Sequence, residues 1–323
     1  MFRKKQLLSD LKPGAFVDDV FVVKIKRELR PYQNGFRFTL ILSDASGRSV
    51  EYVYWGDHDE TAVRRIFDSI QDDSVIHIQA THGSYRGKPQ LSSQPGDMVT
   101  VLSPGEYEPM DFIQPARRPI DDMLKELDHH IASVKNPDLH SLLTSVFTDP
   151  HIRDKLRIHP AAVEIHHNRL GGFLEHILET TSLCKLCIKF YELDHDLTIT
   201  GALLHDIGKL DELSISTRIK ATRDGQLLGH ITQGALYLNQ KMNTLKTPAL
   251  LREKLLHIVI AHHGHLEYGS PKTPMFPEAM AVHFADATSA KVDELKTFID
   301  SVKGNIEGDF VYYKRGNLNL LVK

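Results

Sequence analysis

Histidine and aspartate residues recur inside the apolar segments of the carboxyl-terminal part of this 323-residue chain. In the stretch LLHDIGKL, for example, His205 and Asp206 end an apolar run. Other such residues lie in or beside further apolar segments: His176, His230, His262, His263 and Asp286. A buried imidazole or carboxylate without a partner is costly, so groups that arrive from separate helices need one another or a cation. The pattern predicts a helical region that gathers these side chains around metal.

The composition is that of a globular protein, with 41% hydrophobic and 25% charged residues, and the length predicts two domains. No apolar run approaches the roughly 20 residues that span a bilayer, so we expect a cytoplasmic protein without membrane contact. Cys184 and Cys187 are expected to be free thiols, because two cysteines cannot staple a chain of this length. A net charge of −3 argues against binding nucleic acid by bulk electrostatics and favours a local groove.

The first hundred residues have the pattern of β structure. Alternating and β-branched runs predict strands, and one helical period interrupts them at residues 59–70; the expected strands are residues 15–30, 35–44, 47–56, 74–85 and 88–102. Three strands, a helix and two strands follow the order of a five-stranded OB-fold β-barrel, which we predict for residues 1–104. The proline-rich residues 105–120 are the expected linker.

Helical periods dominate residues 121–323, for which we predict an all-α bundle ending in a small hairpin around Arg315 and Gly316. The longest amphipathic segment, GGFLEHILETTSLCKLCIKFYEL, carries His176. In DLTITGALLHDIG, Gly208 is the expected C′ residue that ends the helix. The predicted fold class is therefore multi-domain α+β, with a barrel followed by a helical bundle.

The order of the polar residues, H…HD…H…HH…D, resembles that of the HD-domain metal-dependent phosphohydrolases. The match extends to LLHDIGK, to the glycine before His230 and to HFAD around Asp286. With a barrel in front and HHNRLGGFLEH before His176, the whole chain resembles the YhaM-type 3′-5′ exoribonucleases.

This resemblance implies a site for two divalent metal ions. The first ion would have four ligands: His176, His205, Asp206 and Asp286. The second would be held by His230 and His262, with Asp206 as the bridge. Two such cations about 3.5 to 4 Å apart can activate a water molecule and hold a scissile phosphate. Mostly imidazole ligands favour manganese, iron, cobalt or zinc over magnesium. Manganese is the ion we expect, with iron, cobalt, zinc or magnesium as alternatives. Asp206 and Lys209 are the predicted catalytic residues.

The implied activity is 3′-5′ hydrolysis of single-stranded nucleic acid, with RNA favoured over DNA. OB-fold barrels bind single strands by stacking bases on aromatic side chains and pairing phosphates with basic ones. We predict six contacts to substrate, three near the metal site and three on the barrel: His263, His167, Arg169, Arg37, Tyr54 and Lys88. His166 shares the segment of His167 and is a further candidate. About half of an alternating aromatic set faces the core, and Trp55 is expected to be partly buried.

Two other interpretations fit the same residues. An HD-type phosphodiesterase or phosphatase could act on a small nucleotide, which the balanced charge favours slightly, whereas the barrel favours a polymer. A non-catalytic OB-fold nucleic-acid-binding protein could carry structural metals. The presence of every expected ligand argues against a degenerate site. The sequence is also compatible with a homo-oligomer and does not reveal the physiological metal.

Overall fold

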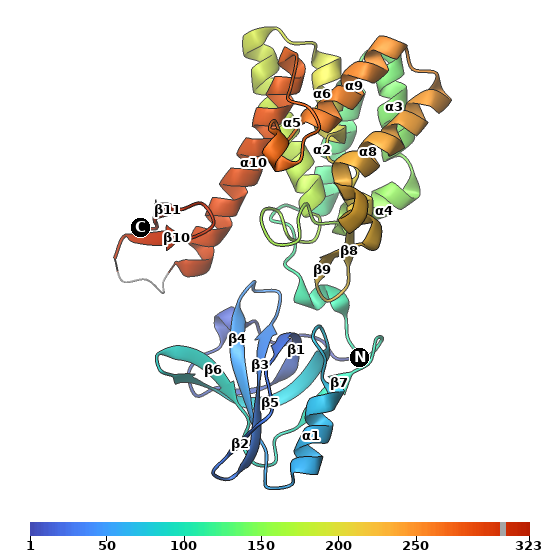
Figure 1. The fold of residues 1–323 in the computed structure, drawn as a ribbon. Helices are drawn as coiled ribbons and strands as arrows, with labels where there is room; N and C mark the ends of the chain where they lie inside the picture. The colour runs from blue at the N-terminus through green and yellow to red at the C-terminus, as the bar shows by residue number, and fades with distance from the viewer. Residues whose placement is uncertain (304–307) are drawn as a thin grey trace. The chain divides into compact units, whose positions relative to one another are not determined.

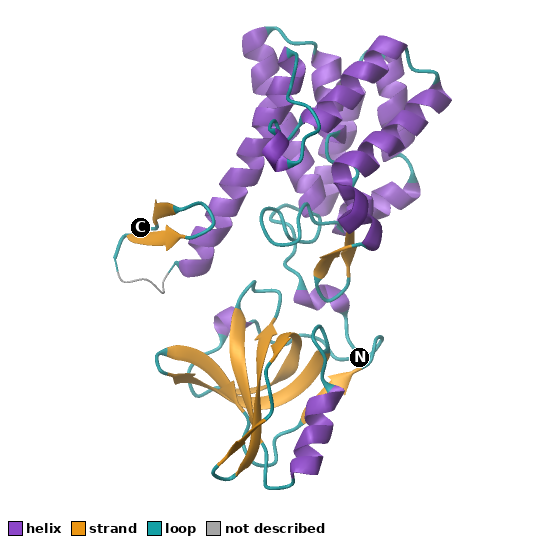
Figure 2. Ribbon diagram, viewed as in Figure 1, coloured by secondary structure: helices purple, strands orange, loops and turns teal. Residues whose placement is uncertain are grey.

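The computed structural model describes residues 1–303 and 308–323, which fall into two compact units. The first unit contains Met1–Gln114 and Ser216–Arg218, and the second contains Pro115–Ile215 and Ile219–Lys323. The first unit is rich in strands and the second in helices (Figures 1 and 2), which confirms the predicted α+β class. The chain passes from one unit to the other at Gln114 and Pro115, inside the segment predicted as a linker.

The first unit is a closed barrel. β1 pairs with both β3 and β5, β3 pairs with β4, β4 runs parallel to β6, and β6 pairs with β5. This ring of five strands, with α1 between β4 and β5 in the chain, is the predicted OB-fold. The strands and helix of the ring are β1 (Phe16–Lys26), β3 (Gly35–Ser43), β4 (Ser49–Trp55), α1 (Glu60–Ser69), β5 (Val75–Tyr85) and β6 (Lys88–Ser92).

Two further strands extend the ring. β2 (Arg30–Tyr32) pairs with the start of β3, and β7 (Val99–Leu102) pairs with the start of β5. The expectation of one strand over residues 88–102 was wrong, because a turn separates β6 from β7. Gly96 has a φ of 95° in this turn, and the Asp97 amide donates to the Gln94 carbonyl at 3.0 Å. Short 3-10 helices lie at Leu8–Asp10 and Pro109–Phe112.

Alternation along the strands fills the barrel. In β3, Phe38, Leu40 and Leu42 are buried, whereas the alternate residues Arg37, Thr39 and Ile41 are only partly covered. The interior is completed by residues such as Phe21, Tyr52, Ile76, Ile78 and Leu91. Arg37 and Thr39 therefore lie on the outer face of the barrel, where a ligand can reach them.

The second unit is a bundle of helices around one hydrophobic core. Its main helices are α2 (Ile120–Ser133), α3 (Pro137–Phe147), α4 (Pro150–Ile158), α5 (Gly172–Tyr191), α6 (His195–Leu204), α7 (Lys209–Glu212), α8 (Arg223–Leu245), α9 (Ala249–Ala261) and α10 (Pro277–Val302). Phe173, Ile177, Leu203 and Val282 are among its fully buried residues, and they bring α5, α6 and α10 together. These helices supply most of the polar side chains described below.

Smaller elements complete the second unit. A hairpin of β8 (Leu213–Ile215) and β9 (Ile219–Ala221) connects α7 to α8, and a 3-10 helix lies at Leu266–Tyr268. The predicted terminal hairpin is present as β10 (Phe310–Tyr313) and β11 (Leu318–Leu321).

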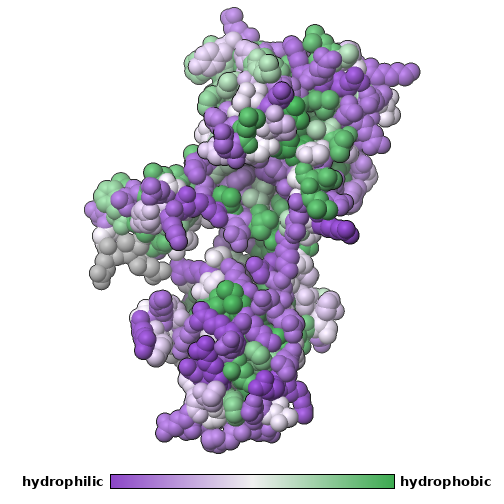
Figure 3. Space-filling view, in the orientation of Figure 1, coloured by the Kyte–Doolittle hydropathy of each residue, from purple (hydrophilic) through white to green (hydrophobic). Residues whose placement is uncertain are grey.

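Within the described ranges, no helix combines the length and apolar character that a bilayer span requires. Hydrophilic side chains are interspersed with apolar ones over the face drawn in Figure 3.

Candidate metal centre and nucleic-acid interface

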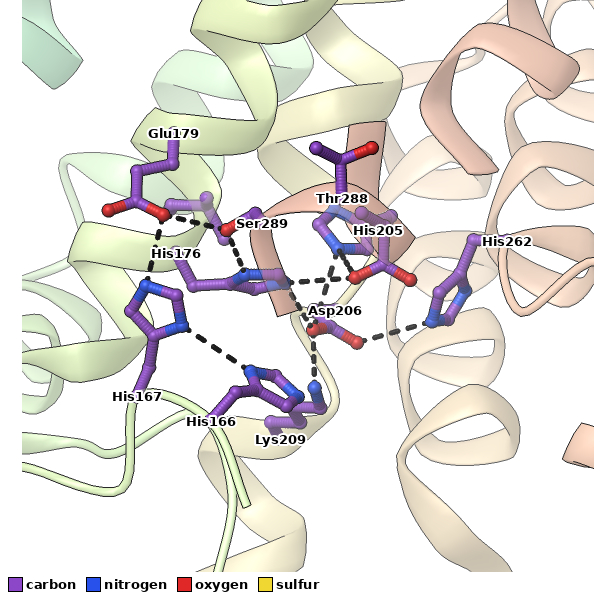
Figure 4. A network of polar contacts seen from close by, with 12 residues as sticks. His166, His167, His176, Glu179, His205, Asp206, Lys209, His262, Thr288 and Ser289 are labelled. Atoms are coloured by element: carbon purple, nitrogen blue, oxygen red, sulfur yellow. Dashed lines mark hydrogen bonds and ion pairs between the residues drawn. The ribbon is translucent and has the colours of Figure 1, made fainter. Parts of the chain in front are cut away.

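The six predicted metal ligands come together inside the second unit. His176 lies on α5, His205 and Asp206 follow α6, and Asp286 lies on α10. His230 lies in α8, and His262 directly follows α9. Figure 4 shows the side chains of His176, His205, Asp206 and His262 pointing toward one another from these separate elements. The structure thus brings together residues that are up to 110 positions apart in the chain.

Asp206 lies at the middle of this cluster, and its two carboxylate oxygens face different histidines. Oδ2 is 3.3 Å from His176 Nε2 and 3.4 Å from His205 Nε2. Oδ1 is 3.5 Å from His230 Nε2 and 3.3 Å from His262 Nε2. The Asp206 carboxylate therefore divides the histidines into two pairs.

Asp286 belongs to the first of these pairs. Its Oδ1 lies 3.1 Å from His176 Nε2 and 3.7 Å from His205 Nε2. His176, His205, Asp206 and Asp286 each offer a ligand atom within 4.8 Å of the others. Two imidazoles and two carboxylates at this spacing can hold a divalent cation.

The ligand atoms are buried and lack ordinary partners. Among the described residues, no hydrogen bond reaches Nε2 of the four histidines or Oδ1 of Asp206. Orphaned polar atoms of this kind are costly in a protein interior, and here they converge on one place. Bound cations would satisfy them, so the residues present fit a divalent metal.

The charges of the cluster reinforce one another. Burial alone raises the pKa of the Asp206 carboxyl, but Lys209 and His205 hold that pKa well below its usual range. Burial likewise raises the pKa of Asp286, and its contacts with His176 and His205 more than reverse the effect. Both carboxylates are therefore ionised. Burial lowers the pKa of His205, yet Asp206 and Asp286 raise it to about 10.

Lys209 contacts the same carboxylate. Its Nζ lies 2.6 Å from Asp206 Oδ2, and the side chain is almost completely buried. Burial lowers the pKa of Lys209, but the charges of Asp206 and Asp286 raise that pKa by more than burial lowers it. The ammonium group therefore stays charged. The predicted catalytic pair, Asp206 and Lys209, is thus in direct contact.

Gly208 has a different role from the one predicted. Its φ of −64° lies in the right-handed region, and α6 already ends at Leu204, so Gly208 is not a left-handed C′ residue. A Cβ at this position would lie 2.0 Å from the His230 carbonyl oxygen and 2.6 Å from the Gly234 amide nitrogen. The glycine is required because α8 packs directly on this backbone, which keeps His230 close to Asp206.

His263, predicted to contact substrate, lies beside the second histidine pair. It forms a cluster with His230 and His262 whose ligand atoms lie within 4.8 Å of one another. Its Nδ1 donates to the Tyr268 carbonyl oxygen at 2.8 Å, and burial lowers its pKa. The side chain remains partly accessible, so it can face either a cation or a substrate.

His167 and Arg169 are placed differently from the prediction, because both are buried. His167 has no exposed surface, and its Nε2 donates to Glu179 at 3.1 Å. Arg169 donates to Glu175 at 2.7 Å and to Asp293 at 2.7 Å. This placement argues against direct contact with substrate and indicates that the two residues hold α5 and α10 together.

His166 lies beside the cluster, as His167 does. Its ring centroid is 5.1 Å from that of His176, and burial lowers its pKa to about 2. Figure 4 shows His166 between His167 and Lys209. The segment turns sharply here, because His167 has a φ of 46° and Gly172 packs against the His167 carbonyl.

Three supporting residues were not identified from the sequence: Glu179, Ser289 and Glu212. Glu179 lies three positions after His176, and Ser289 lies three positions after Asp286, so each shares a helix face with a ligand. That spacing was the signal that could have found them. Glu212 lies 3.1 Å from His230 Nδ1 across the β8–β9 connection, and no sequence spacing predicts that contact.

The barrel carries a groove of about 340 Å³ on its outer face. Most of its lining comes from β3 and β4, and the rest comes from β2, β5, β6 and the segment after β1: Arg27, Glu28, Arg30, Arg37, Phe38, Thr39, Glu51, Val53, Trp55, Tyr85 and Gln90. The Arg37 guanidinium lies 5.1 Å from the centre of the Trp55 ring. Trp55 is half-buried, as expected, and its Nε1 donates to Ser92 Oγ at 2.8 Å.

The other two predicted barrel contacts lie outside this lining. Tyr54 packs on the core, with its ring stacked on Phe38 at 4.8 Å between centroids. Its two neighbours in the strand, Val53 and Trp55, both line the groove, so alternation directs the Tyr54 side chain away from it. The groove therefore gives no support to the prediction that Tyr54 contacts substrate. Lys88 is exposed at the start of β6, opposite Tyr85.

Comparison with known proteins finds one similarity within the helical unit and others that extend over most of the chain. Residues 173–291 match the family model of the HD domain. The 3′-5′ exoribonuclease YhaM of Halalkalibacterium halodurans is 31% identical over 295 residues, which are 90% of this chain and 88% of that protein. The 3′-5′ exoribonuclease YhaM of Bacillus velezensis is 31% identical over 297 residues, which are 90% of each chain.

Solved structures resemble a smaller part of the chain. The p204 HINb domain covers 30% of this chain and 47% of its own, with a TM-score of 0.24 and 20% identity. Fission yeast Pot1 with single-stranded DNA covers 31% of this chain and 40% of its own, with a TM-score of 0.24 and 11% identity.

Proposed function

The chain belongs to the YhaM family of 3′-5′ exoribonucleases, and from that premise we propose that it shortens single-stranded RNA from the 3′ end. The bond broken is a phosphodiester, water is the second reactant, and the products are a nucleotide and a shortened strand. One observation carries the proposal: the two oxygens of the buried Asp206 carboxylate face two separate histidine pairs. A carboxylate in that position is suited to bridge two cations.

The proposed site would hold two divalent cations, with manganese as the preferred ion. His176, His205, Asp206 and Asp286 would hold the first, and His230 and His262 would hold the second together with Asp206. When bound, such a pair lowers the pKa of water and neutralises charge on a phosphate. Imidazole nitrogens make up most of the ligands, and this favours manganese over magnesium.

The chain's own residues have distinct tasks in this proposal. Asp206 keeps the two positions together and supplies negative charge to both. Lys209 stays charged beside Asp206, and its ammonium group would stabilise the negative charge that grows on the phosphate oxygens. His263, with its proton held on Nδ1 by the Tyr268 carbonyl, presents its other nitrogen toward the second position.

The barrel groove is the proposed surface for the single strand. Arg37 and Trp55 lie together there, which provides a cation for a phosphate and an aromatic ring for a base. Arg27 and Arg30 line the same groove, but Glu51 and Glu28 lie 3.2 and 3.5 Å from them. Arg37 is therefore the arginine we expect to contribute most to binding.

The test is a degradation assay with the purified full chain. Single-stranded RNA and DNA, labelled at the 5′ end, are incubated with manganese, magnesium, cobalt or zinc. A ladder of 5′-labelled products that shortens one nucleotide at a time from the 3′ end is expected, with RNA cut faster than DNA. Activity that does not rise with oligonucleotide length would instead favour an enzyme for small nucleotides. Strand binding without any cleavage would favour a binding protein and overturn the proposal.

A further inference from the structure

The four histidines of the metal centre are held at their outer nitrogens by two different kinds of partner. His205 Nδ1 donates to the Ala202 carbonyl at 2.8 Å, and His262 Nδ1 donates to the Val259 carbonyl at 2.6 Å. A carbonyl oxygen can only accept, so each of these rings carries a proton on Nδ1. In the neutral ring, Nε2 then keeps its lone pair for a cation. The orientation of these two rings is set by main-chain carbonyl groups. Replacing the side chain of Ala202 or Val259 therefore leaves the acceptor in place.

The other two histidines depend on carboxylates. His230 Nδ1 lies 3.1 Å from Glu212 Oε2, and the His230 amide also donates to Glu212 Oε1 at 3.1 Å. Both oxygens of the Glu212 carboxylate thus face donors of His230, one on the ring and one on the main chain. Glu212 therefore keeps the proton of His230 on Nδ1.

His176 reaches its carboxylate through a serine. Its Nδ1 is 3.1 Å from Ser289 Oγ, and Ser289 Oγ donates to Glu179 Oε2 at 2.8 Å (Figure 4). A hydroxyl has one proton, and an ionised carboxylate can only accept. The serine proton therefore points to Glu179, and the serine oxygen must accept from His176. The chain Glu179–Ser289–His176 has one consistent direction.

The two kinds of partner are distributed evenly over the centre. On the Oδ2 side of Asp206, His205 is held by the main chain and His176 by the serine relay. On the Oδ1 side, His262 is held by the main chain and His230 by Glu212. Each half thus has one histidine whose orientation depends on a replaceable side chain. Within residues 1–303 and 308–323, the two replaceable supports share no hydrogen bond or ion pair.

We propose that Ser289 with Glu179, and Glu212 separately, are positioning residues that set the cation affinity of the two halves independently. The inference rests on the proposed two-cation site. Partners of this kind fix the ring and raise the basicity of the ligand nitrogen, and their loss costs about 10- to 100-fold in metal affinity. Ser289 and Glu179 govern the half that contains His176, and Glu212 governs the half that contains His230.

Calorimetric titration of manganese into the metal-free full chain measures both halves. Wild type is expected to take up two ions. Ser289→Ala should weaken one binding event by about 10- to 100-fold and leave the other unchanged, and Glu212→Gln should weaken the other event by a similar factor. Glu179→Gln is a second route to the first result, because it keeps the size of the side chain and removes the charge at the end of the relay.

Matched controls lie beside each substituted residue. Thr288→Ala removes a hydroxyl from the position next to Ser289, but that hydroxyl donates to Phe284 in its own helix. Asp211→Asn changes the carboxylate next to Glu212. Asp211 pairs with Lys155 and not with a histidine of the centre. Both controls should bind two ions with wild-type affinity. Circular dichroism confirms that each variant keeps its helices.

Anomalous diffraction from manganese-treated crystals identifies which half is affected. Ser289→Ala should lose occupancy beside His176 and His205, and Glu212→Gln should lose it beside His230 and His262. The inference is overturned if either variant weakens both binding events alike, or if neither variant changes an affinity. It is also overturned if a control variant weakens a binding event as much as its matched substitution does. A wild-type chain that binds fewer than two ions would overturn the two-cation site itself, which is a distinguishable result.

Discussion

The metal centre and the barrel groove differ in how strongly each residue is constrained. In the metal centre, buried ligand atoms converge from separate helices, and none of the four histidine Nε2 atoms has a hydrogen bond within the described residues. In the groove, Arg27 and Arg30 are exposed, lie beside acidic neighbours and can move aside. A change in the metal centre should therefore have a large effect on RNA cleavage or on stability. A change in the groove should have only a small effect on the affinity for RNA.

The largest effect is expected for Asp206→Asn. The amide keeps the size of the side chain but cannot supply the charge that both histidine pairs face, so RNA cleavage should fall by at least about 1000-fold. Rates on a labelled single-stranded RNA measure the loss. The affinity for that RNA, measured without added metal, should stay within a factor of about 3, because the barrel groove is unchanged. Comparable cleavage by the variant would contradict the central role of Asp206.

Gly208→Ala tests whether close backbone packing holds the centre together. The new Cβ would overlap the His230 carbonyl oxygen, so α8 must shift, and we expect a loss of at least about 3 kcal/mol in the free energy of unfolding. Urea unfolding followed by circular dichroism measures it.

The matched control for this substitution is in the barrel. A Cβ at Gly83 meets no atom within 4 Å, and its φ is not positive. Gly83→Ala should therefore change the stability by less than about 1 kcal/mol, in the stabilising direction. Equal losses in the two variants would mean that the contact between Gly208 and His230 is not the constraint.

The same contrast explains what the sequence could predict. The convergence of residues such as His176 and Asp286 could be predicted because a polar residue on an apolar helix face has few alternatives, and because the order of these residues was specific. The closed barrel followed from the order of its strands and helix. Side-chain direction on the barrel was less certain, because Tyr54 and Trp55 are adjacent aromatics and alternation alone does not say which one faces inward.

Other details depended on tertiary contacts that leave no local pattern. A glycine after a helix can end it or admit a neighbouring backbone, and Gly208 does the second. His167 and Arg169 lie in a segment without a helical or strand period, so their burial against Glu179 and Asp293 could not be read from spacing. The turn between β6 and β7 was missed because residues 88–102 begin and end with strand-like sequence.

Asp293→Asn tests the buried ion pairs that surround the centre. Burial raises the pKa of Asp293, but Arg169 and His167 lower it to about 2. A depressed carboxyl pKa stabilises the fold above the unfolded-state value of about 4 and loses that contribution as the pH falls toward 2. At pH 7 the variant should therefore lose about 2 kcal/mol, and the difference from wild type should shrink between pH 4 and pH 2.

The control for this pH dependence is an exposed pair. Asp122 contacts Lys125 at 3.1 Å with most of both side chains in solvent. Asp122→Asn should cost less than about 0.5 kcal/mol at any pH. Urea unfolding at pH 7, 4 and 3 measures both variants. A difference for Asp293→Asn that does not depend on pH would show that lost packing, and not charge, is responsible.

The smallest effect is expected in the barrel groove. Arg37→Ala removes one cation from beside Trp55, so the affinity for single-stranded RNA should fall by about 3- to 10-fold, and the slope of log affinity against log salt should decrease by about 0.7. Tyr54→Ala is the comparison, because Tyr54 is stacked on Phe38 and does not line the groove. It should lower the unfolding free energy by about 1 to 3 kcal/mol without changing that slope. If Tyr54→Ala changed the slope and Arg37→Ala did not, the strand would bind a different face of the barrel.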